Sequence, residues 1–165
     1  MGYYLPLSRV YVSLGRTRLG NAQRGVDDFR KSLADYRDQG NRIIVPSFLG
    51  ALARFEAAAQ NTERALALID EALVISQEGG DRLYDSNLHR LRGNILLKRD
   101  PANPAQAEEA FKTSLSIAKQ QGARTFELLA SLALGKLYHR PIVSSKPTLS
   151  SRPRSKVFRR RRRCL

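Results

Sequence analysis

Over the first 140 positions, apolar residues recur at the helical spacing of three and four, and no stretch sustains the alternation of apolar and polar residues typical of a strand. Three times, a small residue is followed by large apolar residues four and eight positions later, which places all three on one helical face. These triplets are Gly25, Phe29 and Leu33; Ala65, Ile69 and Leu73; and Ala107, Phe111 and Leu115. The pattern predicts amphipathic helices.

A glycine follows each of these predicted helices. Gly40, Gly80 and Gly122 recur at spacings of 40 and 42 residues, and each comes after a run that closes in polar residues. Glycine suits the left-handed backbone conformation that terminates many helices. The two additional residues of the second spacing fall in a turn that contains two prolines, over residues 100–104.

A further helix is predicted after each glycine, with a small residue near its centre. Ala53, Gly93 and Gly135 occupy equivalent positions, where a small side chain lets a neighbouring backbone approach closely. Turn signals separate the helices of each pair at residues 20–21, 60–62 and 100–104, with Asn61 or Thr62 as an N-cap. Helix pairs are therefore expected over residues 3–39, 42–79 and 82–121, and an additional helix over 124–140.

This pattern resembles the tetratricopeptide repeat (TPR), although the period near 40 exceeds the usual 34 residues. The first pair matches that repeat in Ser13, Gly20, Gly25, Phe29 and Ser32. The longer form is similar to the C-terminal repeat arms of class III adenylate or guanylate cyclases with an AAA-type ATPase module, and of LuxR-type maltose-activator-like signalling proteins. Residues 88–97, 107–111 and 118–123 carry this closer likeness.

The resemblance implies an all-α fold, a TPR-like right-handed superhelical solenoid of about three helix pairs plus one extra helix, over residues 1–140. It also implies a non-catalytic module for protein–protein interaction or regulatory ligand sensing, as a piece of a larger signalling protein. A solenoid of this kind presents its first helices along a concave groove. No cofactor is expected, and a phosphate-binding loop of the type Gly-x-x-x-x-Gly-Lys-Ser/Thr does not occur in the sequence.

Groove residues in the resembled family lie three positions before and one after the small residue. Four residues of this sequence are the candidates for binding a protein or an acidic peptide: Arg54, Arg90, Asn94 and Lys136. Arg90 and Asn94 are spaced so that both can contact one carboxylate of the ligand. The alternative is an ordinary charged helix face.

The net charge of +14 comes mostly from the C-terminal segment. Residues 141–165 contain nine basic residues and no acidic residue, together with prolines and serines that disfavour a packed helix. We expect a disordered basic tail there. Its arginine run could bind RNA, DNA or anionic lipid, resemble a nuclear localisation signal, or be a translated segment without function. The run consists of Arg159, Arg160, Arg161, Arg162 and Arg163.

Catalysis and metal binding find little support in the sequence, so an enzyme is not expected. The two histidines, His89 and His139, are 50 residues apart, and Cys164 is the single cysteine. Asp85 precedes His89 by one helical turn, a spacing more typical of a surface pair than of a catalytic dyad. The lone cysteine fits a reducing compartment, which indicates the cytoplasm, and no apolar stretch approaches the length of a membrane span.

The last predicted helix lacks a predicted partner. Its leucines belong to a face that a following helix would cover, and terminal repeats usually need a polar cap. We therefore expect self-association through this end of the array. The leucines are Leu128, Leu132, Leu134 and Leu137.

Overall fold

The computed structural model describes residues 4–18, 22–40 and 42–139. Within these ranges the chain is all-helical and has no strand, which confirms the predicted fold class. The helices are α1 (Tyr4–Arg18), α2 (Ala22–Asp38), α3 (Val45–Ala58), α4 (Thr62–Gly79), α5 (Asp85–Arg99), α6 (Ala105–Gln120) and α7 (Arg124–Tyr138). Their bounds agree with the predicted helix pairs to within a few residues. The predicted basic tail and the turn at residues 20–21 lie outside the described residues.

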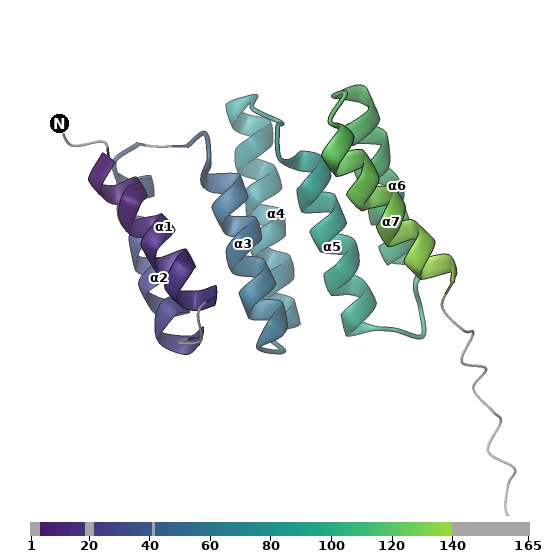
Figure 1. Ribbon diagram of the computed structural model, residues 1–165, viewed down its shortest axis with the longest axis horizontal. Coiled ribbons are helices and arrows are strands. Elements are labelled where there is room, and N and C mark those ends of the chain that lie inside the picture. The colour runs from purple at the N-terminus through teal and green to yellow at the C-terminus, as the bar shows by residue number, and fades with distance from the viewer. Residues whose placement is uncertain (1–3, 19–21, 41, 140–165) are drawn as a thin grey trace, which may run out of the picture.

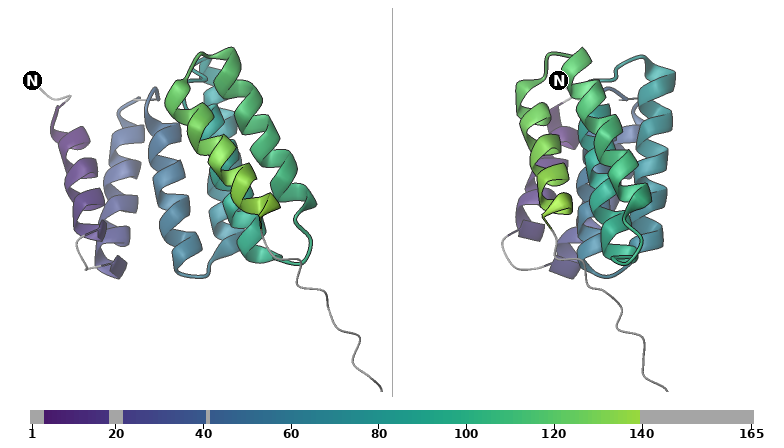
Figure 2. Two further views of the ribbon diagram at one scale, coloured as in Figure 1. Left: turned by 45° about the vertical axis from the view of Figure 1, so that its right-hand side comes forward. Right: turned by 90° about the vertical axis from the view of Figure 1, so that its right-hand side faces the viewer.

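The helices stand side by side in two layers, with α1, α3, α5 and α7 in one and α2, α4 and α6 in the other (Figure 1, Figure 2). Each helix of the second layer contacts the helices before and after it in the chain. In the first layer, α3 contacts α5 and α5 contacts α7, whereas the described parts of α2, α4 and α6 do not contact one another. None of the described helices is both long and apolar enough to cross a membrane.

The three glycines predicted to terminate helices all adopt the left-handed conformation. Gly40, Gly80 and Gly122 have φ angles of +79°, +71° and +62°, which confirms the prediction made from their spacing. At the end of α6, the Gly122 N–H donates to the Lys119 carbonyl over 3.1 Å, and the next N–H donates to the Ala118 carbonyl over 2.9 Å. This pair of bonds satisfies carbonyls that the last helical turn leaves free.

The turn between α3 and α4 forms the same motif without a glycine. Gln60 has a φ of +67°, and its N–H donates to the Ala57 carbonyl over 3.3 Å. The Asn61 N–H donates to the Glu56 carbonyl over 2.9 Å. Asn61, one of the two predicted candidates, is the N-cap of α4, but its side chain makes no capping bond. It donates instead to the Glu56 carboxylate, over 2.9 Å from Nδ2 to Oε2.

The small residue predicted at the centre of α5 is a point of close approach. A Cβ built on Gly93 would lie 2.4 Å from Cε1 of Phe111 and 3.0 Å from the carbonyl oxygen of Ala107, both on α6. The bare backbone of Gly93 is therefore what lets α6 pack this closely. Gly135, the equivalent residue of α7, has nothing within 4 Å of the same built atom. The two glycines differ because α6 covers α5, whereas no described helix follows α7.

Two buried serines join α5 to α6 by hydrogen bonds, near the start of α5. The Ser86 hydroxyl donates to the Ser114 carbonyl over 2.9 Å, and the Ser114 hydroxyl donates to the Ser86 carbonyl over 2.7 Å. Both residues are 0% exposed. The reciprocal bonds satisfy both hydroxyls within the protein interior, as buried polar groups require.

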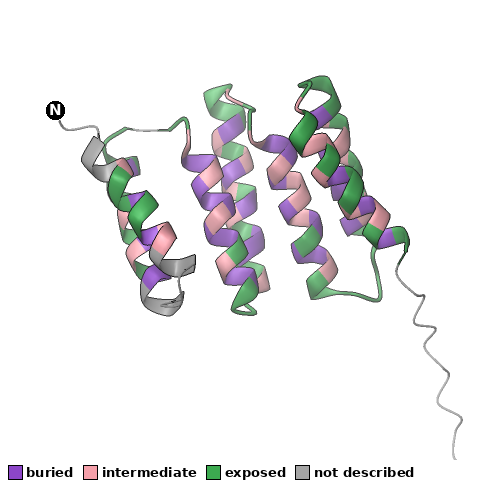
Figure 3. Cartoon of the chain, viewed as in Figure 1, coloured by how far each residue is buried: buried purple, intermediate pink, exposed green. Residues whose placement is uncertain are grey.

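Aromatic side chains join the first helix pair to the second. Phe48 of α3 makes edge contacts with Tyr11 of α1 and with Phe29 and Tyr36 of α2, at ring-centroid distances of 5.3, 6.1 and 6.3 Å. Such geometry directs the positive ring edge towards the negative ring face. Buried residues line the inward faces along the whole array (Figure 3).

Glu56 places a charge inside this interface. Its side chain is 1% exposed, and its carboxylate accepts hydrogen bonds from Arg30 of α2 and from Asn61, while the Arg64 guanidinium lies 3.4 Å away. Burial by itself would raise the pKa of Glu56, but these partners together hold the pKa below its ordinary value. The carboxylate therefore links three consecutive helices as an anion.

The leucines of α7 divide between two faces, which corrects the prediction that all four lie on an open face. Leu134 and Leu137 are 9% and 8% exposed and pack inward, whereas Leu128 and Leu132 are 69% and 51% exposed. Residues 128 and 132 are one helical turn apart, but residues 134 and 137 fall on the opposite side of the helix. The open face of α7 is thus narrower than predicted from the sequence.

Candidate functional site

The structure brings three of the four predicted groove residues together. Arg54 of α3 and Arg90 and Asn94 of α5 line a single pocket of about 380 Å³ between the two helices. We refer to it as the basic pocket. Its lining is completed by Ala57, Ala58, Leu91, Ile95 and Lys98.

The local sequence explains why a pocket forms at this place. Arg90, Asn94 and Lys98 are spaced four residues apart, which makes them one polar stripe along α5. The facing part of α3 supplies two alanines, residues 57 and 58, whose small side chains leave the space open. The polar stripe therefore faces a hollow rather than a packed interface.

Arg90 is the half-buried cation of the basic pocket. Burial lowers the pKa of Arg90, and the nearby charge of Arg54 lowers it further. Its Nη2 donates to Asn87 Oδ1 over 2.7 Å, but its Nε is buried without a hydrogen-bond partner. Since an arginine stays charged in proteins, the side chain keeps both an unmet donor and an unbalanced charge.

None of the described residues that line the basic pocket is acidic. Two guanidinium groups from neighbouring helices therefore share a site without a carboxylate between them. Their mutual repulsion is relieved when an anion enters, and each guanidinium can offer two parallel donors to a carboxylate or phosphate. The arrangement is suited to binding an anionic group.

Lys98 is a pocket residue that the sequence analysis missed. Its Nζ donates to the Ala57 carbonyl in the last turn of α3, which holds the side chain across the two helices. The signal was present in the sequence, because Lys98 follows Asn94 by the same four residues that separate Asn94 from Arg90. The groove positions taken from the resembled family include residues 90 and 94 but not residue 98, which lies one helical turn further along α5.

The remaining predicted groove positions are distributed differently. Lys136 is exposed in the last turn of α7 and does not line the basic pocket. Gly50, three positions before the small residue of α3, is covered by α5: a Cβ there would lie 2.9 Å from Leu88 Cδ2. The five arginines at 159–163 lie outside the described residues.

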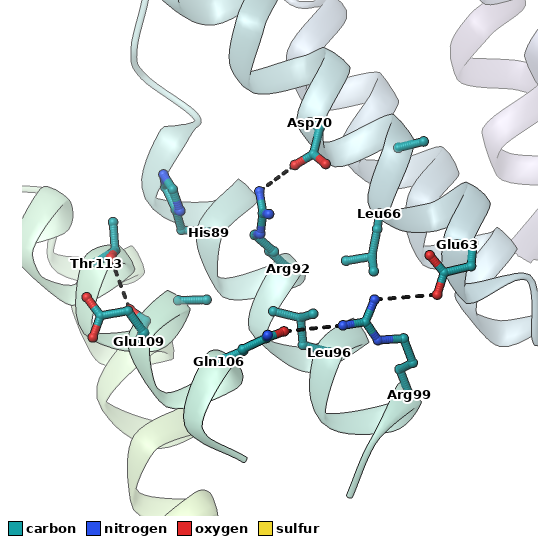
Figure 4. Close-up of a pocket in the computed structure, with 12 residues that line it drawn as sticks. Glu63, Leu66, Asp70, His89, Arg92, Leu96, Arg99, Gln106, Glu109 and Thr113 are labelled. Atoms are coloured by element: carbon teal, nitrogen blue, oxygen red, sulfur yellow. Dashed lines mark hydrogen bonds and ion pairs between the residues drawn. The ribbon is translucent and has the colours of Figure 1, made fainter. Parts of the chain in front are cut away.

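A second and larger pocket of about 640 Å³ lies between α4, α5 and α6 (Figure 4). Its residues were not predicted from the sequence. Ion pairs bridge its walls: Arg92 pairs with Asp70, and Arg99 Nη1 lies 3.4 Å from Glu63 Oε1. Arg99 also donates to Gln106 over 3.2 Å. Because both arginines already have acidic partners, neither offers an unbalanced charge to a ligand.

His89 borders this second pocket (Figure 4). Burial lowers the pKa of His89, the charges of Arg92 and Arg82 act in the same direction, and Asp85 opposes them. The Asp85 carboxylate is itself buried, and it accepts hydrogen bonds from Ser76 and from Arg82 Nε, the latter over 2.8 Å. Asp85 therefore accepts its hydrogen bonds from Ser76 and Arg82 rather than from the His89 imidazole.

No three His, Cys, Asp or Glu side chains gather as metal ligands would, as far as the described residues extend. No family model matches the chain, and neither a curated protein nor a solved structure matches it.

Proposed function

We propose that residues 1–140 form a TPR-like right-handed solenoid that acts as a non-catalytic protein-interaction module, with the basic pocket binding an acidic segment of a protein or peptide. The module would serve as a regulatory arm of a larger signalling protein. A reducing compartment such as the cytoplasm fits its single cysteine.

The helix contacts support the solenoid. Antiparallel pairs are stacked so that α3 contacts α5 and α5 contacts α7 along one side, while the described second helices do not contact one another. An array whose helices lie closer on one side curves towards that side. The basic pocket opens between two of the first-layer helices, α3 and α5, which is the side where a solenoid binds extended partners.

The uncompensated charge of the basic pocket is the single observation from which we infer an acidic ligand. Arg54 and Arg90 meet there, and none of the described residues that line the pocket is acidic. A carboxylate would balance the charge of both guanidinium groups. A charged hydrogen bond of this kind contributes about 1.5–3 kcal/mol.

The test is the anisotropy of a fluorescein-labelled oligoglutamate peptide titrated with the full chain, against the corresponding oligoglutamine peptide. We expect binding of the acidic peptide only, and weaker binding as salt concentration rises. Arg90→Gln should weaken binding by about tenfold or more, which corresponds to about 1.4 kcal/mol.

Arg92→Gln is the matched control for that variant. It removes the same charge from the same helix, but Arg92 faces the second pocket and pairs with Asp70. Its peptide affinity should stay close to that of the unmodified chain. Equal losses in both variants would show that net charge alone matters, and would refute the basic pocket as the site.

The second candidate function is nucleic-acid binding through the arginine run at residues 159–163. Five consecutive arginines in a segment without acidic residues are the observation that favours it. The full chain and a variant with these five arginines changed to glutamine would be titrated with single-stranded and duplex oligonucleotides over a salt series. Binding that disappears in the variant and falls steeply with salt would support this function, and equal binding by both chains would exclude it.

A further inference from the structure

The open face of α7 lies at the C-terminal end of the helical array. Leu128, Leu132 and Tyr138 are 69%, 51% and 61% exposed, and Gly135 has open space where its side chain would be. Helical spacing places Leu128, Leu132 and Gly135 on the side opposite the buried Leu134 and Leu137, whereas the Tyr138 hydroxyl reaches Glu108 of α6. The described array ends with α7 (Figure 2). This apolar surface does not overlap the basic pocket, so the inference drawn from it is independent of the proposed function.

The equivalent face of α5 shows that a surface of this kind binds another helix. Leu128 and Gly135 stand 42 residues after Ser86 and Gly93, and both of these α5 residues contact α6 directly. On α5 these positions are fully covered by a second helix. On α7 the same positions are open, so this face has the geometry of a helix-binding surface without its helix.

We propose that α7 of a second copy of this chain covers this face, in an antiparallel pair about a two-fold axis. Leu128 and Gly135 are seven residues apart, or two helical turns, and therefore lie on the same stripe. An axis through the point midway between them, next to Ser131, places each Leu128 over Gly135 of the partner. Leu128 of each copy then fills the open space at Gly135 of the other copy, and the two-fold axis makes this contact occur twice.

The segment that follows α7 is a poor alternative occupant. Residues 141–165 contain nine basic residues, no acid and prolines at 141, 147 and 153, without a recurring apolar face.

The length of α7 limits the size of the dimer interface. A helix of 15 residues, as α7 is, is about 22 Å long. A single pair of such helices buries less than the standard protein interface of about 800 Å² per partner. The dimer should therefore be reversible, with a dissociation constant in the micromolar range.

Sedimentation velocity of the full chain over a wide range of concentration is the first test. We expect a monomer–dimer equilibrium, which Gly135→Leu abolishes because the added side chain occupies the place of the partner's Leu128. The double variant Leu128→Ala/Gly135→Leu should dimerise again, because it exchanges the large and small positions. Gly15→Leu is the control, since Gly15 of α1 is also a helical glycine with nothing within 4 Å. Circular dichroism would verify that each variant is folded.

A cysteine introduced at the proposed two-fold axis distinguishes between the possible occupants of the open face of α7. In Ser131→Cys, oxidation should yield a disulfide between residue 131 of two chains, seen as a dimer on a non-reducing gel and identified by mass spectrometry. An intramolecular bond from residue 131 to the native Cys164 would show that the chain's own C-terminal segment covers the face, and would overturn the proposal. A chain that stays monomeric at all concentrations and forms no such inter-chain disulfide would overturn it as well.

Discussion

The Arg30 guanidinium of α2 reaches across to the buried Glu56 carboxylate of α3, and so joins the first helix pair to the second. Removing one partner of a buried ion pair leaves the other without compensation. We expect Glu56→Ala to lower the free energy of unfolding by about 3 kcal/mol. Asp27→Ala is the control, because Asp27 pairs with the same arginine but is 58% exposed, and it should cost less than about 1 kcal/mol. Urea denaturation of both variants measures the difference.

The same carboxylate gives the protein a specific response to acid. The pKa of Glu56 is lower in the folded chain than its ordinary value of 4.5, so the folded state favours the ionised form. This stabilisation is complete above pH 4.5 and is lost as the pH falls through the lowered folded pKa. We therefore expect the stability difference between the unmodified chain and Glu56→Gln to shrink below that pH. A difference that is constant from neutral to acid pH would contradict the role of the charge.

Glycine at position 93 is required by packing rather than by backbone conformation. Gly93→Ala would press a methyl group against Phe111, and we expect a net loss of about 1–2 kcal/mol despite the better helix propensity of alanine. Gly135→Ala is the matched control, because its added Cβ meets nothing. That variant should gain about 0.5–1 kcal/mol. Chemical denaturation at low protein concentration would compare the two, and destabilisation of equal size would show that packing is not the cause.

The turn at Gln60 holds a residue in a conformation that glycine adopts at lower cost. We expect Gln60→Gly to stabilise the chain by about 1 kcal/mol, because it relieves the left-handed backbone strain. Gly122→Ala makes the opposite change in the same motif at the end of α6, and should destabilise the chain by about 1 kcal/mol. Thermal unfolding followed by circular dichroism would record shifts of opposite sign.

Features that depend on residues close together in the chain could be predicted from the sequence. The left-handed conformations of Gly40, Gly80 and Gly122 follow from local backbone sterics, and the helix bounds follow from the glycines and the apolar period. The close approach at Gly93 was also predicted, because a small residue recurs at the same place in each repeat. The basic pocket was predicted in part, through Arg54, Arg90 and Asn94.

Features that depend on how distant helices lie against one another could not be predicted. The buried cluster around Glu56 takes its partners from α2 and from the turn before α4, so no local pattern reveals it. The second pocket draws its residues from three helices for the same reason. Asn61 illustrates both cases: its place at the start of α4 follows from the sequence, but its hydrogen bond to Glu56 does not.

The described helices contact only those next to them or next but one in chain order. Low contact order of this kind lets a chain fold quickly, because few long loops must close before contacts form. Each helix pair can therefore assemble soon after its own residues have been synthesised, and then serve as a template for the pair that follows. During translation the array would grow from α1 towards α7, and unfolding by force would proceed in steps of one helix pair.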